Sequence, residues 1–310
     1  MVMTSILGIG EAMVELSPAG QGTLTHGFAG DVFNTLWYAR ALTPTDWDVS
    51  FYSGFGGDVM GAKMRQFIAD AGIDCQNAPT IDECPTGLYM IHLDGAERSF
   101  SYWRDTSGAR QMMRTPNLLW QQVANADLVY LSGITLAILQ GTDAEMLLDN
   151  LRSHMKPDAQ IAFDPNIRPR LWQDEDRMKR VISRAGGIAD IVLPSFDDEA
   201  ACFGDETPDD CADRYLRSGA KLVIVKNGEL PTLIAKGQDR ETRDVPRYTG
   251  VVDTTAAGDS FNGAFLARHM AGAKPIDAVQ AGQICAGRVV CTKGALAPFA
   301  TVQQEFVSPD

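Results

Sequence analysis

The sequence has 310 residues, of which 45% are hydrophobic, so the chain carries enough apolar side chain to fill a large core. This composition excludes disordered and fibrous proteins. The chain has 27 lysines and arginines and 40 aspartates and glutamates. The resulting formal charge of -13 disfavours nucleic acid and anionic lipid as partners.

The N-terminal segment and the cysteines indicate a cellular compartment. The chain begins without a basic segment, and no apolar stretch of about 18 residues occurs anywhere in it. We therefore expect a cytoplasmic protein. The six cysteines form no C-x-x-C pair and the four histidines are scattered, so we expect no structural zinc site and thiols that stay reduced.

Short apolar runs alternate along the chain with longer segments of helical pattern. The runs that read as buried strands are Ser5–Gly10, Leu128–Ser132, Gln160–Phe163, Ile191–Leu193 and Leu222–Val225. This alternation predicts an α/β fold with a doubly wound, mostly parallel sheet, whose ligands lie beyond the carboxyl ends of the strands. Gly8 and Gly10 lack the third glycine of a dinucleotide motif, and we expect them to mark close packing.

Two stretches, Glu11–Ala29 and Gly87–Arg104, break the alternation and read as antiparallel strands. We expect them to form a small sheet laid over the ends of the main strands. This sheet would be a discontinuous lid, built from about residues 11–34 and 84–105 of a single domain that spans residues 1–310.

Polar residues follow two of the later strands. Arg168, after the third run, has the guanidinium geometry that clamps a carboxylate or a phosphate through two hydrogen bonds, although a solvent-exposed arginine is the alternative. Lys226-Asn227-Gly228 follows the last run directly. The chain contains no G-x-x-x-x-G-K-[ST] segment, so a nucleotide site would not be of the P-loop type.

The segment Val252–Phe265 begins with small and polar residues and continues with aromatic residues at near-helical spacing, which predicts a helix from near Gly258 to about Gly272. Small residues leave the N–H groups of the first turn open, and with the helix dipole these groups bind an anion such as phosphate. Asp259 lies in the same turn, where its carboxylate is placed to accept a proton. The alternative is that Asp259 only complements the dipole.

The segment Asp253–Phe265 resembles, position by position, the second signature of the ribokinase-like, or PfkB, family of carbohydrate kinases. Ala29–Asn34 resembles the first signature, and the resemblance extends from Gly8 to about Pro298. It implies a ribokinase-like three-layer α/β/α sandwich with a small β-sheet lid. It also implies a kinase that uses ATP and Mg²⁺.

The resemblance implies a role for individual residues as well. Asp259 would be the general base that takes the proton of the acceptor hydroxyl. The anion hole for the transferring phosphoryl group would consist of Ala256, Ala257 and Gly258. The first signature would contact the sugar through Gly30, Asp31 and Asn34. The nucleotide would contact Asn166, Lys226, Asn227, Gly228, Asp253, Thr255 and Gly258.

The sequence departs from the family pattern at two positions. Pro231 replaces the second glycine of the turn that begins at Lys226, which affects the shape of the nucleotide loop. Phe196 replaces an asparagine three residues before Glu199. We expect Glu199 to orient Mg²⁺ through water, because Mg²⁺ usually keeps several waters, with helix-start acidity as the alternative.

The expected lid carries a cluster that resembles 2-keto-3-deoxygluconate kinases of this family, namely Tyr89 and the run Tyr102-Trp103-Arg104. There the tyrosines and the arginine contact a sugar acid, and Arg104 and Arg168 would face its carboxylate. A neutral sugar would leave both arginines unpaired, which is costly if they are buried. Trp103 lies on the opposite face of a regular strand from Tyr102, and we expect it to pack.

The sequence therefore predicts an ATP-dependent sugar-acid kinase that phosphorylates 2-keto-3-deoxy-D-gluconate to the 6-phosphate. A fructokinase or another neutral-sugar kinase is the alternative within the family. A non-catalytic sugar-acid or nucleotide sensor is the alternative from another class. Relatives often pair their lid sheets, so we expect a homodimer formed through the lid, with no nucleic-acid or membrane partner.

Overall fold

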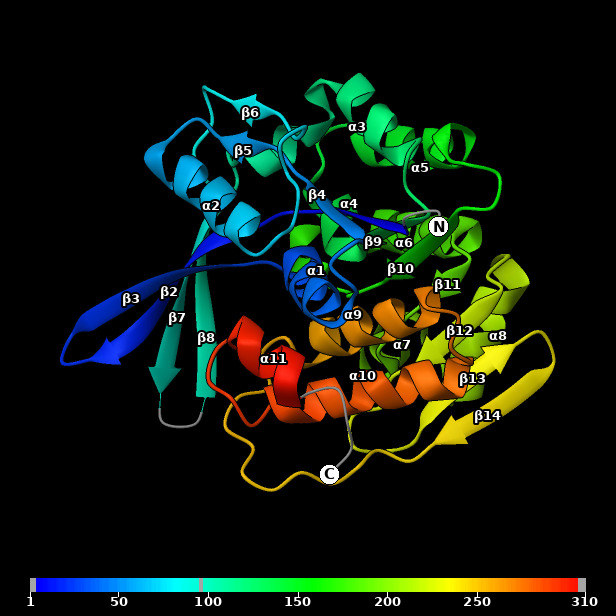
Figure 1. Cartoon of the computed structure of the whole chain (residues 1–310). Coiled ribbons are helices and arrows are strands. Elements are labelled where there is room, and N and C mark those ends of the chain that lie inside the picture. Colours follow the sequence, from blue (N-terminus) through cyan, green and yellow to red (C-terminus); the bar gives the residue numbers. More distant parts are fainter. Residues whose placement is uncertain (1–3, 95–96, 306–310) are drawn as a thin grey trace.

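The main sheet has eight strands in the order β14-β13-β12-β11-β10-β9-β1-β4 (Figure 1). Its strands are β1 (Ser5–Ile9), β4 (Asp48–Tyr52), β9 (Leu128–Ser132), β10 (Gln160–Asp164), β11 (Ile191–Val192), β12 (Leu222–Val225), β13 (Thr232–Lys236) and β14 (Asp239–Arg243). The structure is a computed structural model that describes residues 4–94 and 97–305. The start of the chain and residues 95–96 of the expected lid lie outside the described residues.

The strands from β4 to β12 are parallel, and β13 and β14 continue the sheet in antiparallel fashion. All five apolar runs that the sequence predicts as strands form strands of this sheet. Every residue of β9 and β12 is buried, as expected of strands covered on both faces. Because the parallel strands end at one edge, the polar residues after β9, β10 and β12 are brought together there.

Helices cover both faces of the sheet, which confirms the predicted three-layer sandwich (Figure 1). One layer contains α1 (Asp31–Leu42), α9 (Ala257–Met270), α10 (Pro275–Val289) and α11 (Phe299–Glu305). The other contains α3 (Pro116–Val123), α4 (Gly133–Ile138), α5 (Asp143–His154), α6 (Glu175–Ile188), α7 (Phe196–Phe203) and α8 (Pro208–Ser218). A further helix, α2 (Val59–Asp70), packs beside the short pair β5 (Phe55–Gly56) and β6 (Thr80–Ile81). Two 3₁₀ helices, Gly108–Arg114 and Pro169–Leu171, complete the chain.

Glycines allow α1 to approach its neighbours closely. A Cβ atom added at Gly263 of α9 would lie 2.4 Å from the carbonyl oxygen of Thr35 in α1. At Gly8 in β1, an added Cβ would lie 2.6 Å from a methyl carbon of Leu36. The prediction that Gly8 marks close packing is therefore confirmed. These approaches place the start of α1 beside the start of α9, where the site lies.

A second sheet of four strands projects from one side of the molecule, in the order β3-β2-β7-β8 (Figure 1). Its strands are β2 (Met13–Gly20), β3 (Thr23–Ala29), β7 (Leu88–Asp94) and β8 (Glu97–Trp103). The two hairpins are antiparallel, but β2 and β7 join them in parallel, which the sequence did not predict. We call this sheet the lid. One of its faces packs Met13, Tyr89 and Ile91 near Ala256 and Ala295.

The outer strand β8 exposes large apolar side chains. Phe100 is 41% exposed, Tyr102 53% and Trp103 56%. The prediction that Trp103 packs within the chain is therefore wrong, because β8 is an edge strand and no described segment covers this residue.

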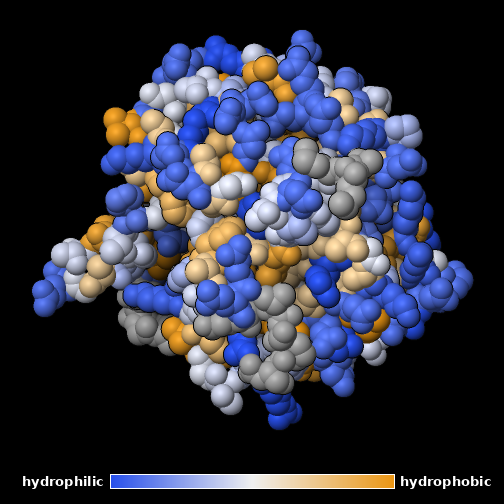
Figure 2. Space-filling model, in the orientation of Figure 1, coloured by the Kyte–Doolittle hydropathy of each residue, from blue (hydrophilic) through white to orange (hydrophobic). Residues whose placement is uncertain are grey.

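The surface and the thiols agree with the composition. Figure 2 shows mostly hydrophilic residues over one face of the molecule, with hydrophobic residues in small groups. All six cysteines are free thiols. Within residues 4–94 and 97–305, none of the helices has the length and apolar character that crossing a bilayer requires.

Candidate active site

The N-terminus of α9 is open toward the edge of the main sheet. Its N-cap residue, Ala256, has φ 60° and ψ 15°, a left-handed conformation that costs an L-residue about 1–2 kcal/mol. Among the described residues, no side chain caps this helix. A Cβ atom added at Gly258 would have only Lys226 Nζ near it, at 3.6 Å. The Ala257 N–H donates to the Thr254 carbonyl oxygen at 3.3 Å, and the rest of the first turn offers N–H groups without a side-chain cap and free space, which together suit an anion.

Asp259 lies in this turn and meets the start of α1. The amide Nδ2 of Asn34 donates a hydrogen bond of 2.8 Å to Asp259 Oδ2, which joins the two predicted signatures. Burial, helped by the nearby carboxylates of Asp31 and Asp164, raises the pKa of Asp259 to about 7, although Asn34 and Lys226 lower it. A carboxyl group with this pKa exchanges a proton readily near neutral pH.

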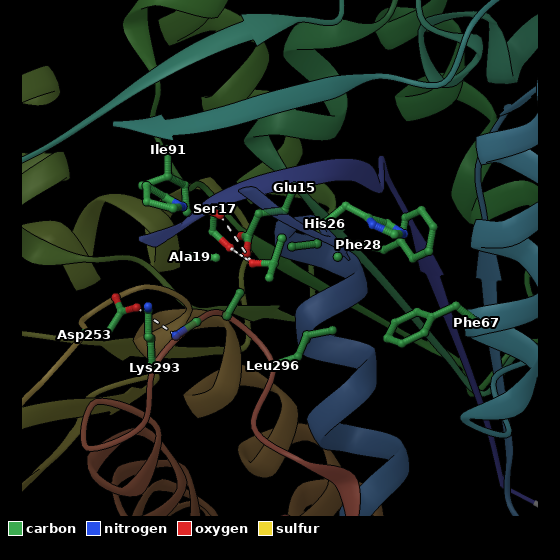
Figure 3. Close-up of a pocket in the computed structure, with 16 residues that line it drawn as sticks. Glu15, Ser17, Ala19, His26, Phe28, Phe67, Ile91, Asp253, Lys293 and Leu296 are labelled. Carbon is green, nitrogen blue, oxygen red and sulfur yellow. Dashed lines mark hydrogen bonds between the residues drawn. The ribbon is translucent and has the colours of Figure 1, made fainter. Parts of the chain in front are cut away.

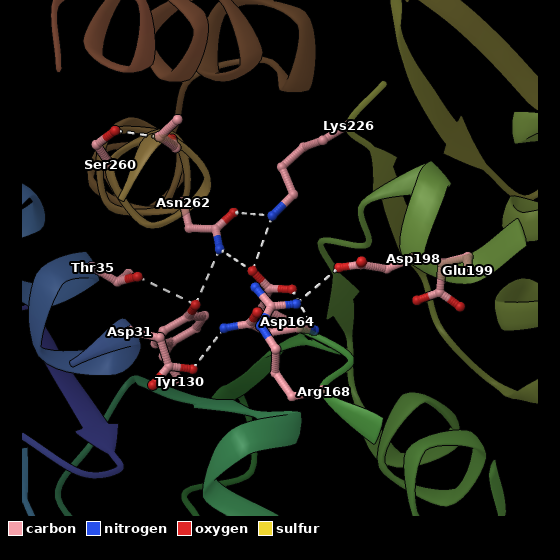
Figure 4. Close-up of polar contacts among 12 residues, drawn as sticks. Asp31, Thr35, Tyr130, Asp164, Arg168, Asp198, Glu199, Lys226, Ser260 and Asn262 are labelled. Carbon is pink, nitrogen blue, oxygen red and sulfur yellow. Dashed lines mark hydrogen bonds and ion pairs between the residues drawn. The ribbon is translucent and has the colours of Figure 1, made fainter. Parts of the chain in front are cut away.

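Lys226 is held next to this turn by two buried residues that the sequence analysis did not single out (Figure 4). Asp164 Oδ2 accepts hydrogen bonds from Lys226 Nζ at 2.9 Å and from Asn262 Nδ2 at 2.6 Å. Asn262 Oδ1 accepts from the same Nζ at 3.2 Å. Asn262 lies in the quoted segment Asp253–Phe265 and Asp164 directly follows the predicted strand Gln160–Phe163, but the partner that they share depends on the fold. The ammonium group is thus fixed beside Gly258.

Asp31 and Asn166 are bonded to each other. Asn166 Nδ2 donates to Asp31 Oδ2 at 2.9 Å, and the backbone N–H of Asn166 donates to Asp164 Oδ1, also at 2.9 Å. Asn166 has φ 33°, a positive value that is strained for a residue with a side chain. The sequence analysis placed Asp31 with the sugar and Asn166 with the nucleotide. In the structure these two residues, assigned to different groups, are in direct contact.

The two arginines that were expected to face the substrate carboxylate both have acidic partners within the chain. Arg104 is 5% exposed and forms an ion pair with Glu11, which is 1% exposed and also accepts from Ser107 Oγ at 2.6 Å. Arg168 is half-exposed and pairs with Asp198 at 3.2 Å. The prediction that a neutral sugar would leave both unpaired is therefore wrong. The sequence analysis missed Glu11 as a partner because it is distant in sequence from Arg104.

The two tyrosines of the lid lie opposite each other, Tyr89 on β7 and Tyr102 on β8. Tyr89 is buried and its hydroxyl donates to Glu15, across the β2–β7 junction. The rings of Tyr89 and Tyr102 have centroids 6.0 Å apart, and the Arg104 guanidinium carbon lies 5.9 Å from the Tyr102 ring centroid. Gly30 lies at the base of the lid, where an added Cβ would be 2.0 Å from the Glu11 carbonyl oxygen. Its lack of a side chain thus has a packing reason.

A cavity of about 800 Å³ opens beside the start of α9. Four of the predicted nucleotide residues line it, namely Lys226, Asn227, Gly228 and Gly258. Its far wall is formed by α10 and by the segment that contains Tyr248. Asp253 and Thr255 are instead bonded to each other, Thr255 N to Asp253 Oδ1 at 2.9 Å, and Asp253 also accepts from Gly294 N. These two shape the turn before α9.

A second cavity of about 400 Å³ lies under the β2–β3 hairpin (Figure 3). It is bounded by Glu15 and His26 of the lid, by Phe67 of α2, and by Asp253 and Lys293 beneath. Asp259 is not among the residues that line either cavity.

Glu199 is not placed to orient a hydrated ion. Its side chain is fully buried, Oε1 accepts from Tyr215 Oη at 2.9 Å, and Oε2 accepts from Arg214 Nη2 at 2.7 Å. Arg214 also pairs with Asp205 at 2.5 Å, so this acidic group already holds a cation. Glu199 is on the far side of Asp198 from the site (Figure 4). The predicted magnesium role of Glu199 is therefore replaced by a structural one.

The buried Glu199 predicts a pH-dependent stability. Burial raises the pKa of Glu199 to about 7, although Arg214 lowers it. The stabilising effect is complete below the ordinary pKa of Glu and is lost as pH rises toward 7, because only the unfolded chain gives up this proton readily. Between pH 5 and 8, wild type should lose on the order of 2–3 kcal/mol more unfolding free energy than Glu199→Gln. Denaturant titrations at both pH values measure it, and parallel losses would contradict it.

Known proteins resemble this chain over most of its length. The profile described as "pfkB family carbohydrate kinase" matches residues 3–301. A 2-dehydro-3-deoxygluconokinase from Dickeya dadantii is 34% identical over 96% of this chain and 98% of its own. A fructokinase from Salmonella typhimurium is 26% identical over 93% of this chain and 94% of its own.

Solved structures have the same fold. A PfkB protein from Polaromonas superposes with a TM-score of 0.84 at 25% identity, covering 98% of this chain and 100% of that one. A fructokinase with bound ATP from Xylella fastidiosa superposes with a TM-score of 0.82 at 20% identity, covering 96% of each chain.

Proposed function

Because the chain belongs to the pfkB family of carbohydrate kinases, we propose that it transfers the γ-phosphoryl group of ATP to 2-dehydro-3-deoxygluconate, giving the 6-phosphate. The name 2-dehydro-3-deoxygluconate is a synonym of 2-keto-3-deoxygluconate. Kinases of this family use ATP with Mg²⁺. The observation that carries the proposal is the position of Asp259, bonded to Asn34 beside the uncapped start of α9.

The residues around the two cavities have distinct tasks in the proposed reaction. ATP supplies the phosphoryl group, and Mg²⁺ would neutralise part of the negative charge of the phosphates. Its triphosphate fits the end of the larger cavity where Lys226, Ala257 and Gly258 meet. The N–H groups of Ala256 to Gly258 and the Lys226 ammonium stabilise negative charge there. Asp164 and Asn262 hold Lys226 in place, so its charge is positioned before the nucleotide binds.

Asp259 takes the proton from the terminal hydroxyl of the sugar acid as that oxygen attacks phosphorus. Asn34 donates to Oδ2, which leaves Oδ1 for the hydroxyl. The Asp31–Asn166 bond ties the sugar side to the nucleotide side. Closure of the lid over the sugar would exclude water, which otherwise competes for the phosphoryl group.

The activity is expected to rise with pH through the range in which Asp259 ionises. Since the pKa of Asp259 is about 7 and its carboxylate is the active form, kcat/KM should be about tenfold lower at pH 6 than its plateau above pH 8. Asp31→Asn removes a neighbouring negative charge that raises this pKa, so its profile should move to lower pH. Initial rates over this pH range measure both midpoints, and an unshifted midpoint in the variant would contradict the assignment.

The lid carries the proposed specificity for a sugar acid. Arg104, Tyr89 and Tyr102 lie together near the lid face that meets Ala256. The buried guanidinium of Arg104 would bind the substrate carboxylate, either in place of Glu11 or together with it. Arg168, at the edge of the sheet, would contact the same carboxylate from below.

We also propose a cytoplasmic homodimer that buries the outer strand of the lid. Its basis is the exposure of Phe100, Tyr102 and Trp103 on the edge strand β8. An uncovered edge with apolar side chains favours pairing with a second copy. Trp103→Ser should shift the molecular mass in solution from dimer toward monomer, as light scattering measures. A wild-type monomer at micromolar concentration would refute the proposal.

The substrate assignment is tested by coupled ADP release with Mg-ATP and four acceptors at equal concentration. These are 2-dehydro-3-deoxygluconate, its galactonate epimer, fructose and ribose. Activity confined to the two keto-deoxy acids is expected. A preference for fructose or ribose would retain the kinase chemistry but replace the substrate by a neutral sugar. Absence of ADP release with all four, with ADP still bound, would favour a non-catalytic sensor.

A further inference from the structure

Gln283 presents a buried hydrogen-bond acceptor beside the larger cavity. The residue is 4% exposed, lies on α10 and lines this cavity. Its amide nitrogen Nε2 donates to Thr232 Oγ1 and to the Arg243 carbonyl oxygen, both at 3.1 Å. A carbonyl oxygen accepts only, so the amide group has one possible orientation, with nitrogen toward Arg243. The side-chain oxygen Oε1 is thereby turned away from these two partners.

Oε1 of Gln283 has no donor within hydrogen-bonding distance among the residues that the structure describes. A buried acceptor left without a partner carries the full desolvation penalty, and native proteins keep few of them. An unpaired atom of this kind beside a cavity is therefore a place where a ligand donor is expected. The fixed amide means that Oε1 selects a donor and rejects an acceptor.

We infer that Gln283 determines which nucleotide base the protein accepts, by receiving a hydrogen bond from the 6-amino group of adenine. This inference rests on the proposed placement of ATP in the larger cavity. With the triphosphate at the α9 end, near Gly258, the base extends toward α10, where Gln283 stands. Guanine and hypoxanthine carry a carbonyl oxygen at position 6, which would face Oε1 and repel it.

The test compares three diphosphates whose purines differ at position 6, with N1 also carrying a hydrogen in IDP. ADP carries an amino group there, IDP a carbonyl oxygen, and purine riboside diphosphate a hydrogen. Titration calorimetry with Mg²⁺ and without sugar gives their dissociation constants for wild type and for Gln283→Met, which keeps the length but has no amide. We expect wild type to bind ADP at least about tenfold more tightly than either analogue. In Gln283→Met, ADP should lose about tenfold and the three should bind within about threefold.

Glu229→Gln is the matched control, because Glu229 lines the same cavity but is exposed. It should leave the ratio of ADP to IDP affinity unchanged. Equal binding of ADP and purine riboside diphosphate by wild type would overturn the inference without any variant, so a misfolded Gln283→Met does not prevent a decision. An unchanged ADP-to-IDP ratio in a folded Gln283→Met would overturn it as well.

A further variant, Ala286→Leu, tests whether the nucleotide lies in the larger cavity at all, because leucine narrows this cavity from α10. Loss of ADP binding in this variant is expected. If Ala286→Leu binds ADP as wild type does, the nucleotide lies elsewhere and the inference falls with the placement. The identity of the sugar does not enter, since no sugar is present.

Discussion

Asp259→Asn is expected to lower kcat by about 10²–10⁴-fold, the usual cost of losing a general base. Asparagine keeps the size of the side chain and an oxygen that accepts from Asn34 Nδ2, so the contact between α1 and α9 persists. What is lost is the capacity to take a proton. Binding of ADP and of the sugar acid should change by less than about threefold, because neither depends on proton transfer.

The alternative role of Asp259, as a charge that complements the helix dipole, predicts a different result. In that case the variant would lose about 0.3–1 kcal/mol of stability and retain its turnover. Asp197→Asn provides the control, since Asp197 lies exposed in the first turn of α7. Rates, ADP affinity and unfolding free energy should be measured for both variants. Turnover of Asp259→Asn close to wild type would exclude its role as the base.

The fold was predictable from the sequence because its signals are local. Five of the eight main strands are short apolar runs that alternate with segments of helical period, so this alternation alone predicted a mostly parallel sheet. The strands β4, β13 and β14 were not predicted, and β14 is polar and exposed. The family was equally predictable, since Asp253–Phe265 and Ala29–Asn34 are contiguous motifs and the family profile covers residues 3–301. The structure adds that α1 and α9 place Asn34 and Asp259 in direct contact.

Partners across the fold were not predictable in the same way. Nothing in the neighbourhood of Arg104 indicates Glu11, and the pairing arises because both lie where the lid joins the main sheet. Glu199 reads as a first-turn acid, but its carboxylate turns to Arg214 on the next helix. Trp103 alternates like a core residue, yet its strand lies at an edge. In each case the sequence gives the chemistry of the side chain and the tertiary packing selects its partner.

Arg104→Gln is expected to reduce kcat/KM for 2-dehydro-3-deoxygluconate by about 10- to 150-fold, which corresponds to the 1.5–3 kcal/mol of a hydrogen bond to a charged group. The informative comparison is 3-deoxyfructose, in which a neutral CH₂OH replaces the carboxylate. For that sugar the change should stay below about threefold. Arg40→Gln is the control, because Arg40 is also buried but bonds only backbone carbonyls far from the lid.

Removing Arg104 alone also leaves the buried carboxylate of Glu11 without its partner, which is expected to cost about 3–5 kcal/mol of stability. The double variant Glu11→Gln/Arg104→Gln removes both charges and should recover most of that loss, while the selectivity for the acid over the neutral sugar stays low. Stability and selectivity thus separate the two roles of Arg104. If both sugars lose activity equally in the folded double variant, Arg104 only holds the lid, and the carboxylate must be recognised elsewhere, with Arg168 as the next residue to replace.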